Sequence, residues 1–239
     1  LFTAKILLQK GISMVNKDEI SKKFLWKLSR NKYVSKTLLK THSTVTVGIP
    51  CYRNSRIVKE VLRILSCNTT NVNYGVLVIN DDPKDKAMEI LFQEARDWFA
   101  SFKVIQNSIN SGVVIANNRF IEHCDSEYLV LMNADVIVTP FWLEKFIDCA
   151  ESMPQWSIIG SRLLYPNNTI QHAGVAFKNE YVWKKNNDFW DRLPYHPLRG
   201  APHNHNECLQ YREMVGVTTA LALFRRSVFD HIGLFDIAY

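Results

Sequence analysis

The sequence lacks the signatures of several common classes of protein. No apolar run approaches the roughly 18 residues that a membrane-spanning helix needs. The apolar start, residues 1–8, is too short for a secretion signal peptide and is followed by no cleavage site. A Gly-x-x-x-x-Gly-Lys-Ser/Thr loop and a Gly-x-Gly-x-x-Gly turn are also absent, which argues against a P-loop enzyme and a dinucleotide site. With 47% hydrophobic and 22% charged residues, a soluble globular protein of another class is expected.

Cysteine is scarce, and none of the five cysteines belongs to a Cys-x-x-Cys pair. An odd number of widely spaced cysteines indicates free thiols in a reducing compartment rather than a disulfide framework. We therefore expect a cytoplasmic protein, and the inner face of a membrane is the alternative location.

The net charge of +6 is concentrated at one end of the chain. Residues 1–41 hold ten Lys or Arg against two acidic residues, whereas the remaining residues hold 19 basic and 21 acidic ones. Because no basic stripe interleaved with aromatic residues runs through the main domain, nucleic acid is not an expected partner.

Residues 1–41 have the pattern of a basic helical arm. Asn16 and Glu19 fit an N-cap with its capping-box partner. Apolar residues follow at helical spacing, and lysines fill the other face. We expect a helical linker or a packing arm from a preceding domain. The alternative is a basic amphipathic helix in peripheral contact with an anionic membrane surface.

Strands alternate with helices from residue 44 onward. The β-rich runs are separated by apolar faces at helical spacing, a rhythm that predicts a mostly parallel sheet flanked by helices. We therefore predict an α/β fold in which residues 42–239 form one domain. The predicted strands of this regular part are 44–49, 75–79, 102–106 and 128–132.

The pattern loosens after Trp156. Residues 178–212 have no clear period and are predicted to form a long loop, which inside a compact domain is functional or mobile. Further strands are predicted within 156–164, 174–177 and 215–224.

The stretch from Tyr128 to Asp135 organises the rest of the prediction. Five apolar or aromatic residues, Tyr128–Met132, are typical of a strand that is covered on both faces. Asn133, Ala134 and Asp135 follow at once, and open α/β sheets bind ligands at this end of their central strands. The alternative is that Asp135 caps a helix that begins near Phe141.

Three predicted strands end in polar residues of this kind. Pro50-Cys51-Tyr52-Arg53-Asn54 follows the first strand, Asn80-Asp81-Asp82 follows the second, and Asn133-Ala134-Asp135 follows the fourth. In a parallel sheet these ends lie at one edge. Two acidic sites at one edge indicate a ligand with hydrogen-bond donors and a divalent metal, since Mg²⁺ is coordinated by carboxylate oxygens together with phosphate oxygens of a ligand.

These motifs, taken in order over residues 44–237, resemble those of family 2 glycosyltransferases. Such a resemblance implies the GT-A fold, with a mostly parallel central sheet and a Rossmann-like nucleotide-binding half. The blocks that carry it are Val47–Tyr52, Asn80-Asp81 with Asp85, Asn110-Ser111-Gly112 with Ala116 and Asn118, Asn133-Ala134-Asp135, Ile170–Gly174, and Arg225-Arg226 with Gly233–Asp236.

The resemblance implies inverting transfer of a sugar from a nucleotide-diphosphate sugar to an acceptor hydroxyl, in polysaccharide or glycoconjugate assembly. Tyr52 and Asp81 would bind the base, and Asp135 would ligate a Mg²⁺ or Mn²⁺ that bridges the diphosphate. The acceptor would be a glycan or a lipid-linked molecule. The other residues expected at the nucleotide are Pro50, Asn110, Gly112, Asn118 and Asn133.

For the acceptor, His172, Trp183 and Trp190 are the candidates, since aromatic rings favour the C–H faces of sugars; a packed loop and a hydrogen-bonded histidine are the alternatives. The catalytic base of the family belongs to an acidic pair beyond its Phe-Asp-Glu block. Here the block reads Phe235-Asp236-Ile237, and Asp236 is the one nearby acid. Asp236 is therefore the candidate base, and a residue beyond position 239 is the alternative.

The sequence also departs from the family pattern. Ala134 stands where the metal motif has an acid or Pro, and Asp82-Pro83 replaces a small residue and Ser. Two other functions therefore stay open: a non-catalytic module that binds a nucleotide or a partner, and a nucleotidyltransferase, which can share a similar sheet and acidic metal site.

Overall fold

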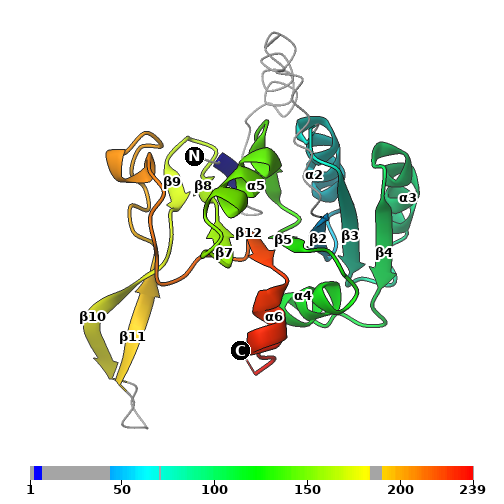
Figure 1. The fold of residues 1–239 in the computed structure, drawn as a ribbon. Coiled ribbons are helices and arrows are strands. Elements are labelled where there is room, and N and C mark those ends of the chain that lie inside the picture. The colour runs from blue at the N-terminus through cyan, green and yellow to red at the C-terminus, as the bar shows by residue number, and fades with distance from the viewer. Residues whose placement is uncertain (1–2, 7–43, 70, 184–189, 239) are drawn as a thin grey trace.

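A six-stranded sheet forms the centre of the molecule (Figure 1). The computed structural model describes residues 3–6, 44–69, 71–183 and 190–238. Neighbouring strands from β4 to β5 are parallel, and β12 is antiparallel to both of its neighbours, β5 and β7. The predicted α/β class with a mostly parallel sheet is confirmed. The sheet order is β4 (Phe102–Gln106), β3 (Tyr74–Asn80), β2 (Val45–Cys51), β5 (Tyr128–Met132), β12 (Leu221–Arg225), β7 (Ile158–Gly160).

The central strand β5 is the continuous apolar run of the sequence. All five of its residues are buried, and it pairs with β2 on one side and β12 on the other. Successive side chains of a strand point to opposite faces, so an apolar run without alternation fits a strand that is covered on both sides.

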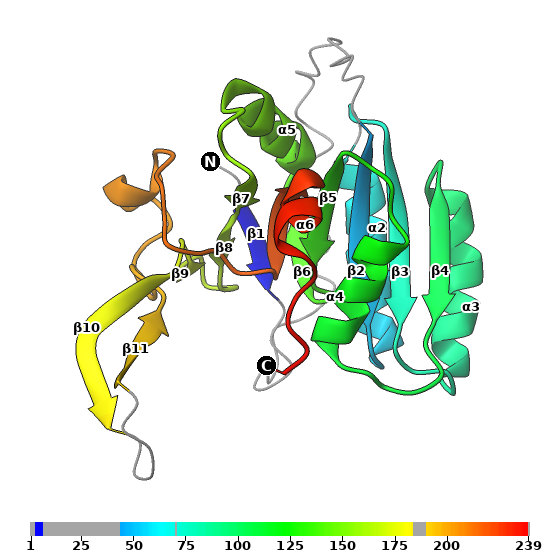
Figure 2. The ribbon, with the colours of Figure 1, turned by 60° about the horizontal axis from the view of Figure 1, so that its bottom comes forward.

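Helices cover both faces of this sheet (Figures 1 and 2). One face packs against α2 (Ser55–Asn68), α3 (Lys86–Ala95) and α5 (Trp142–Ser152), and the other against α4 (Val113–Glu122) and α6 (Ser227–Ile232). The contact with α4 is close: a Cβ added to Gly48 would lie 2.4 Å from the ring of Phe120. Glycine at position 48 therefore lets α4 settle onto β2.

Two successive arginines at the end of β12 fasten helices on opposite faces. Arg225 donates to the carbonyl of Ala150 in the last turn of α5 (2.5 Å) and to the hydroxyl of Tyr128 (3.0 Å). Arg226 donates to the carbonyls of Ile121 and Cys124 at the end of α4. Carbonyls at the C-terminal end of a helix lack partners within the helix. Arginines there donate hydrogen bonds to these carbonyls, and their positive charge interacts favourably with the helix dipole.

A smaller sheet has the strand order β6 (Val136–Val138), β1 (Thr3–Ile6), β8 (Arg162–Leu164), β9 (Ile170–His172). Strand β1 is antiparallel to β6 and parallel to β8. The start of the predicted helical arm is therefore a strand, which corrects the sequence prediction for residues 3–6. The helix predicted after Asn16 lies outside the described residues.

The prediction of a loop over residues 178–212 is wrong for the first half of this range. Strands β10 (Ala176–Trp183) and β11 (Trp190–Tyr195) form an antiparallel hairpin, with an irregular register between Phe177 and Tyr181. The predicted strand 156–164 is divided by Ser161 into β7 and β8, which belong to different sheets. The strand predicted over 215–224 is confined to β12.

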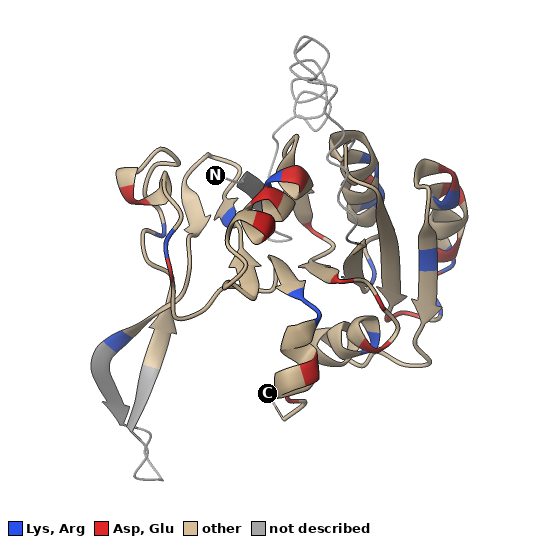
Figure 3. Ribbon diagram, in the orientation of Figure 1, with Lys and Arg blue, Asp and Glu red and all other residues tan. Residues whose placement is uncertain are grey.

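The helices α2, α3 and α5 each carry both acidic and basic residues (Figure 3). This mixed charge agrees with the sequence, which places the basic excess in residues 1–41. Among the described residues, no helix combines the length and the hydropathy that crossing a membrane requires.

We predict that Arg225→Met lowers the free energy of unfolding by about 3 kcal/mol, because the carbonyls of Ala150 and Trp156 and the hydroxyl of Tyr128 lose a charged donor. Denaturant unfolding followed by far-UV circular dichroism measures this value. Arg63→Met, the same change at an exposed position of α2, is the control. Equal stability of the two variants would contradict the role given to Arg225.

Candidate functional site

The polar ends of β2, β3 and β5 line one cavity of about 360 Å³. The strand register explains why they meet. Cys51 of β2 pairs with Asn80 of β3, and Gly48 of β2 pairs with Leu131 of β5. The residues just beyond these pairs therefore emerge at the same level of the sheet edge. The predicted site residues that line the cavity are Pro50, Tyr52, Asp81, Asn110, Gly112, Asn133 and Asp135.

Asp81 is the most extensively hydrogen-bonded acid of the cavity. Asp81 as a whole residue is 3% exposed. It accepts from Asn107 Nδ2 (2.5 Å), from the hydroxyl (2.7 Å) and backbone N–H (3.0 Å) of Ser111, and from the N–H of Gly112 (2.8 Å). Burial by itself raises the pKa of Asp81, but these hydrogen bonds together hold that pKa below its ordinary value. The ionised carboxylate thus fixes residues 107–112 to the end of β3.

Asp135 stands in a different environment. It is half-buried, and burial raises its pKa above the ordinary value of an aspartate. It is not a helix cap: α5 begins at Trp142, and its N-cap is Phe141, at φ 61°. A cation beside Asp135 would favour its ionised form.

The donor set fits a hard divalent cation that is shared with a phosphate ligand. Within the described ranges, no group of three or more His, Cys, Asp or Glu side chains could hold a metal by itself. Mg²⁺ and similar ions are bound in proteins by one or two carboxylates together with substrate phosphates and water. Asp135 supplies such a carboxylate at the cavity wall.

Two helices begin at this cavity. The N-caps of α2 and α4 are Asn54 and Gly112, and neither makes a side-chain capping bond. The first N–H groups of a helix lack partners within the helix and carry partial positive charge, which favours an anion. Gly112 also has φ +83°, a conformation that other residues rarely adopt. The geometry of the cavity therefore favours an anionic ligand.

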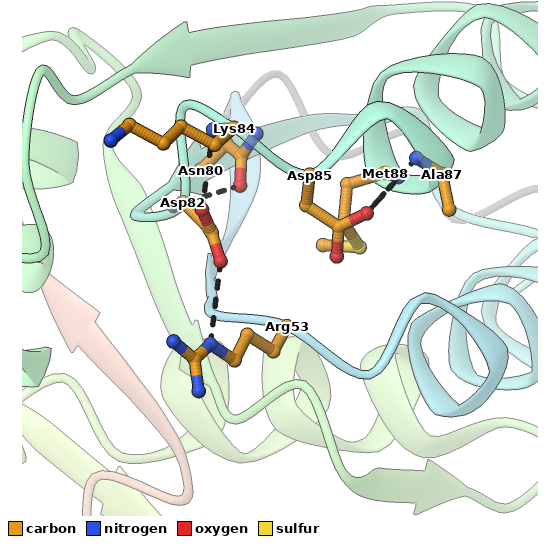
Figure 4. A network of polar contacts seen from close by, with 7 residues as sticks. All are labelled: Arg53, Asn80, Asp82, Lys84, Asp85, Ala87 and Met88. Atoms are coloured by element: carbon orange, nitrogen blue, oxygen red, sulfur yellow. Dashed lines mark hydrogen bonds and ion pairs between the residues drawn. The ribbon is translucent and has the colours of Figure 1, made fainter.

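Tyr52 and Arg53 form the outer wall of the cavity. The guanidinium of Arg53 lies 4.8 Å from the centre of the Tyr52 ring and its Nε lies 3.5 Å from Asp82 Oδ2. Figure 4 shows this ion pair, which joins the loop after β2 to the loop after β3. In the same view Asp85 accepts from the first N–H groups of α3, so this acid of the family-like block is a helix N-cap.

Asn118 and Asp236 are not among the residues that line this cavity. The amide of Asn118 makes two hydrogen bonds to the backbone of Phe235, donating at 2.8 Å and accepting at 2.9 Å. Asp236 is exposed and accepts from the N–H of Ala238 (2.9 Å). Asn118 therefore attaches the segment after α6 to α4, and its contact with a nucleotide stays a prediction.

His172 is fully buried, with both ring nitrogens in hydrogen bonds. Its Nε2 faces the N–H groups of Gly174 (3.2 Å) and Thr218 (3.4 Å), so this nitrogen must accept. The proton is then on Nδ1, which donates to His196 Nδ1 at 2.8 Å. His172 lines a second cavity of about 370 Å³ beside β7 and not the cavity of Asp81 and Asp135. The structure therefore has the hydrogen-bonded histidine that the sequence left as an alternative.

Trp183 and Trp190 are register partners in the hairpin of β10 and β11. Their backbone positions are described, and the orientation of the two indoles lies outside what the structure describes. Their contact with an acceptor stays a prediction.

Asn107 is the main residue of the site that the sequence analysis missed. It directly follows β4, and its side chain contacts the carboxylate of Asp81. The end of this third parallel strand was available as a signal, because it lies at the same edge as the polar ends of β2, β3 and β5.

A mostly parallel sheet that holds acidic and aromatic side chains around a cavity at its strand ends defines an α/β ligand-binding domain of the open-sheet kind. A model of the family described as Glycosyl transferase family 2 matches residues 46–233. The chain therefore belongs to glycosyl transferase family 2, and the GT-A fold implied by the motifs is confirmed.

Two relatives give the extent of the similarity. The chain is 35% identical over 121 residues to the O-antigen biosynthesis protein RfbC of Myxococcus xanthus, which covers 50% of this chain and 9% of the relative. It is 27% identical over 177 residues to an uncharacterized glycosyltransferase of Haemophilus influenzae, covering 71% of this chain and 53% of the relative. The chain thus spans about half or less of the length of these proteins.

Solved structures share the fold at low sequence identity. The mannosyltransferase PcManGT of Pyrobaculum calidifontis, in complex with GDP-Man and Mn²⁺, is 14% identical at a TM-score of 0.58, covering 92% of this chain and 56% of that one. TarS 1–349 of S. aureus in complex with UDP is 15% identical at a TM-score of 0.56, covering 82% and 51%.

We predict a pH dependence of stability from His172. Burial, together with the nearby His196, lowers its pKa to about 4, from 6.5 in an unfolded chain. The unfolded state therefore binds a proton more readily, and the stability present above pH 6.5 is lost as the pH falls toward 4. The expected loss is about 3 kcal/mol.

Denaturant unfolding at several values of pH between 7 and 4 measures this loss. His172→Gln should show a shallower pH dependence than the wild type over this range. His231→Gln, the same change at an exposed histidine, should keep the wild-type dependence. Identical slopes for His172→Gln and the wild type would contradict the buried neutral imidazole.

Proposed function

We propose that the chain is the donor-binding domain of an inverting glycosyltransferase that acts in polysaccharide or glycoconjugate assembly. It would move a sugar from a nucleotide-diphosphate sugar to a hydroxyl of a glycan or a lipid-linked acceptor. The observation that carries the proposal is the single cavity at the sheet edge, where Tyr52, Asp81 and Asp135 meet in a chain of glycosyl transferase family 2.

The names of similar proteins support the ligand class. PcManGT is bound to GDP-Man and Mn²⁺, and TarS 1–349 to UDP. The relative from M. xanthus is named for O-antigen biosynthesis, which supports a role in polysaccharide assembly. We infer from these names a nucleoside diphosphate at the cavity, with the base and the sugar left open.

The residues of the cavity suit the parts of such a donor. The ring of Tyr52, 41% exposed, offers a face on which a base can stack, and Asn110 and Gly112, from the segment fixed by Asp81, also line the cavity. The starts of α2 and α4 favour the diphosphate. Asp135 would hold Mg²⁺ or Mn²⁺, which when bound offsets the charge on the departing nucleoside diphosphate.

Transfer also requires a general base that removes the proton of the acceptor hydroxyl. Asp236 is the candidate from the sequence, although its exposed carboxylate lies in a local turn with Ala238 and not at the cavity. Asp236→Asn tests the assignment, since loss of transfer with unchanged nucleotide affinity is the result expected of a base.

We predict that UDP or GDP together with Mn²⁺ stabilises the protein in thermal unfolding, and that Asp135→Asn loses the part of the shift that needs Mn²⁺. At a ligand concentration of 100 times Kd the stabilisation is about 2.7 kcal/mol. Asp135→Asn should abolish sugar transfer and leave the unliganded melting temperature almost unchanged.

Asp97→Asn, at an exposed position after α3, is the matched control and should behave like the wild type. An Asp135→Asn variant with normal turnover would contradict the metal site. A wild-type protein that no nucleotide stabilises would favour the non-catalytic module over the glycosyltransferase.

A further inference from the structure

The side chain of Asp81 lies at the wall of the cavity in a residue that is only 3% exposed. Its hydrogen bonds hold the pKa of the carboxyl below the ordinary value, so that the carboxylate is ionised at neutral pH. Among the contacts that the described part of the chain makes with it, all four donors are neutral: an amide, a hydroxyl and two backbone N–H groups. A buried charge is costly unless it is paired, so the position of the nearest cation matters.

One cation, Arg119, is connected to Asp81 through the side chain of Asn107. Asn107 is 2% exposed. Its Nδ2 donates to Asp81 Oδ1 at 2.5 Å and to Ser111 Oγ at 2.8 Å, while its Oδ1 accepts from Nη1 of Arg119. A carboxylate only accepts and a guanidinium only donates. The orientation of the Asn107 amide is therefore fixed by its two neighbours.

The three side chains come from three different elements. Asp81 follows β3, Asn107 follows β4, and Arg119 lies on α4. The backbone of Asn107 is also fixed, since its N–H donates to the carbonyl of Asn80 at 2.9 Å. An amide aligned between a carboxylate and a guanidinium is polarised in one direction, which strengthens both of its hydrogen bonds.

The other charged and titratable groups around Asp81 do not supply the positive charge that Arg119 supplies through Asn107. From the loop after β2, Tyr52 and Arg53 line the same cavity, and Arg53 is paired with Asp82 of the loop after β3. From the loop after β5, Asp135 adds a second negative charge to the cavity. Arg119 is thus the charge that approaches Asp81 from within α4.

We propose that Asn107 and Arg119 are positioning residues for the nucleotide: together they keep Asp81 ionised and in a fixed orientation. The fixed carboxylate in turn holds Ser111 and Gly112, whose segment forms the cavity wall and the start of α4. This inference rests on the proposed function and extends it to residues that lie behind the cavity.

The test is the affinity for UDP and GDP with Mn²⁺, measured by titration calorimetry at pH 8 and at pH 4. Without Arg119 the protonation of Asp81 moves to higher pH. In Arg119→Met, the ratio of Kd at pH 4 to Kd at pH 8 should therefore exceed the wild-type ratio by about threefold, the effect of a rise of about one pKa unit that carries the pKa of Asp81 past pH 4. Arg119→Gln, which keeps an N–H donor and removes the charge, should behave in the same way.

Arg119→Lys keeps the charge and should have a ratio close to that of the wild type. Arg63→Met, at an exposed position of α2, is the matched control. Thermal unfolding without nucleotide checks that each variant folds. If Arg119→Met does not fold, the comparison is made with Arg119→Gln.

A purely structural role for Arg119 predicts affinity that falls equally at both pH values, and that result would overturn the proposal. A ratio equal to that of the wild type in both neutral variants would also overturn it, while leaving the proposed function intact. Failure of the wild type to bind any nucleotide would overturn the proposed function and the inference together.

Discussion

The parallel pairing of β2 with β3 and β5 is the constraint on which the rest of the structure depends. Parallel strands place their carboxyl ends at one edge, and the register brings the residues after Cys51, Asn80 and Met132 to one level. Polar segments far apart in the sequence are thereby gathered around one cavity. A shift of one residue in either pairing would turn these strands' side chains to the opposite face and remove the arrangement.

The surrounding structure holds this edge in place from both faces of the sheet. Phe120 of α4 packs directly onto Gly48, and Arg225 and Arg226 fasten the ends of α5 and α4 to the strand beside β5. These contacts hold the helices against the core, and the contacts of α4 also fix the position of its first turn. That start, at Gly112, is the point at which the Asp81 network reaches the cavity.

Much of the central sheet could be predicted from the sequence because its signals are local. The continuous apolar run of β5 and the polar residues that end β2, β3 and β5 depend only on neighbours along the chain. Strand β1 could not be predicted in this way, since its partners β6 and β8 lie more than a hundred residues away. The division of 156–164 at Ser161 likewise depends on which sheet each half joins.

The same distinction applies to the site. Tyr52, Asp81 and Asp135 were found from their positions at strand ends, and the structure brings them together. The hydrogen bonds of Asn118 to the backbone of Phe235 and of His172 to the N–H of Thr218 could not be predicted. These hydrogen-bond partners belong to segments that are distant in the sequence and become neighbours of Asn118 and His172 only in the folded chain. Asn107 was missed because an asparagine after a strand has no charge or motif of its own.

We propose that this edge of the sheet binds a nucleoside diphosphate through a metal held by Asp135. A crystal structure of the protein with UDP or GDP and Mg²⁺ would test this proposal. We expect a Mg²⁺ ion about 2.1 Å from a carboxylate oxygen of Asp135, shared with the diphosphate, and a base beside Tyr52. A nucleotide bound elsewhere, or a diphosphate in the cavity whose Mg²⁺ has no contact with Asp135, would contradict it.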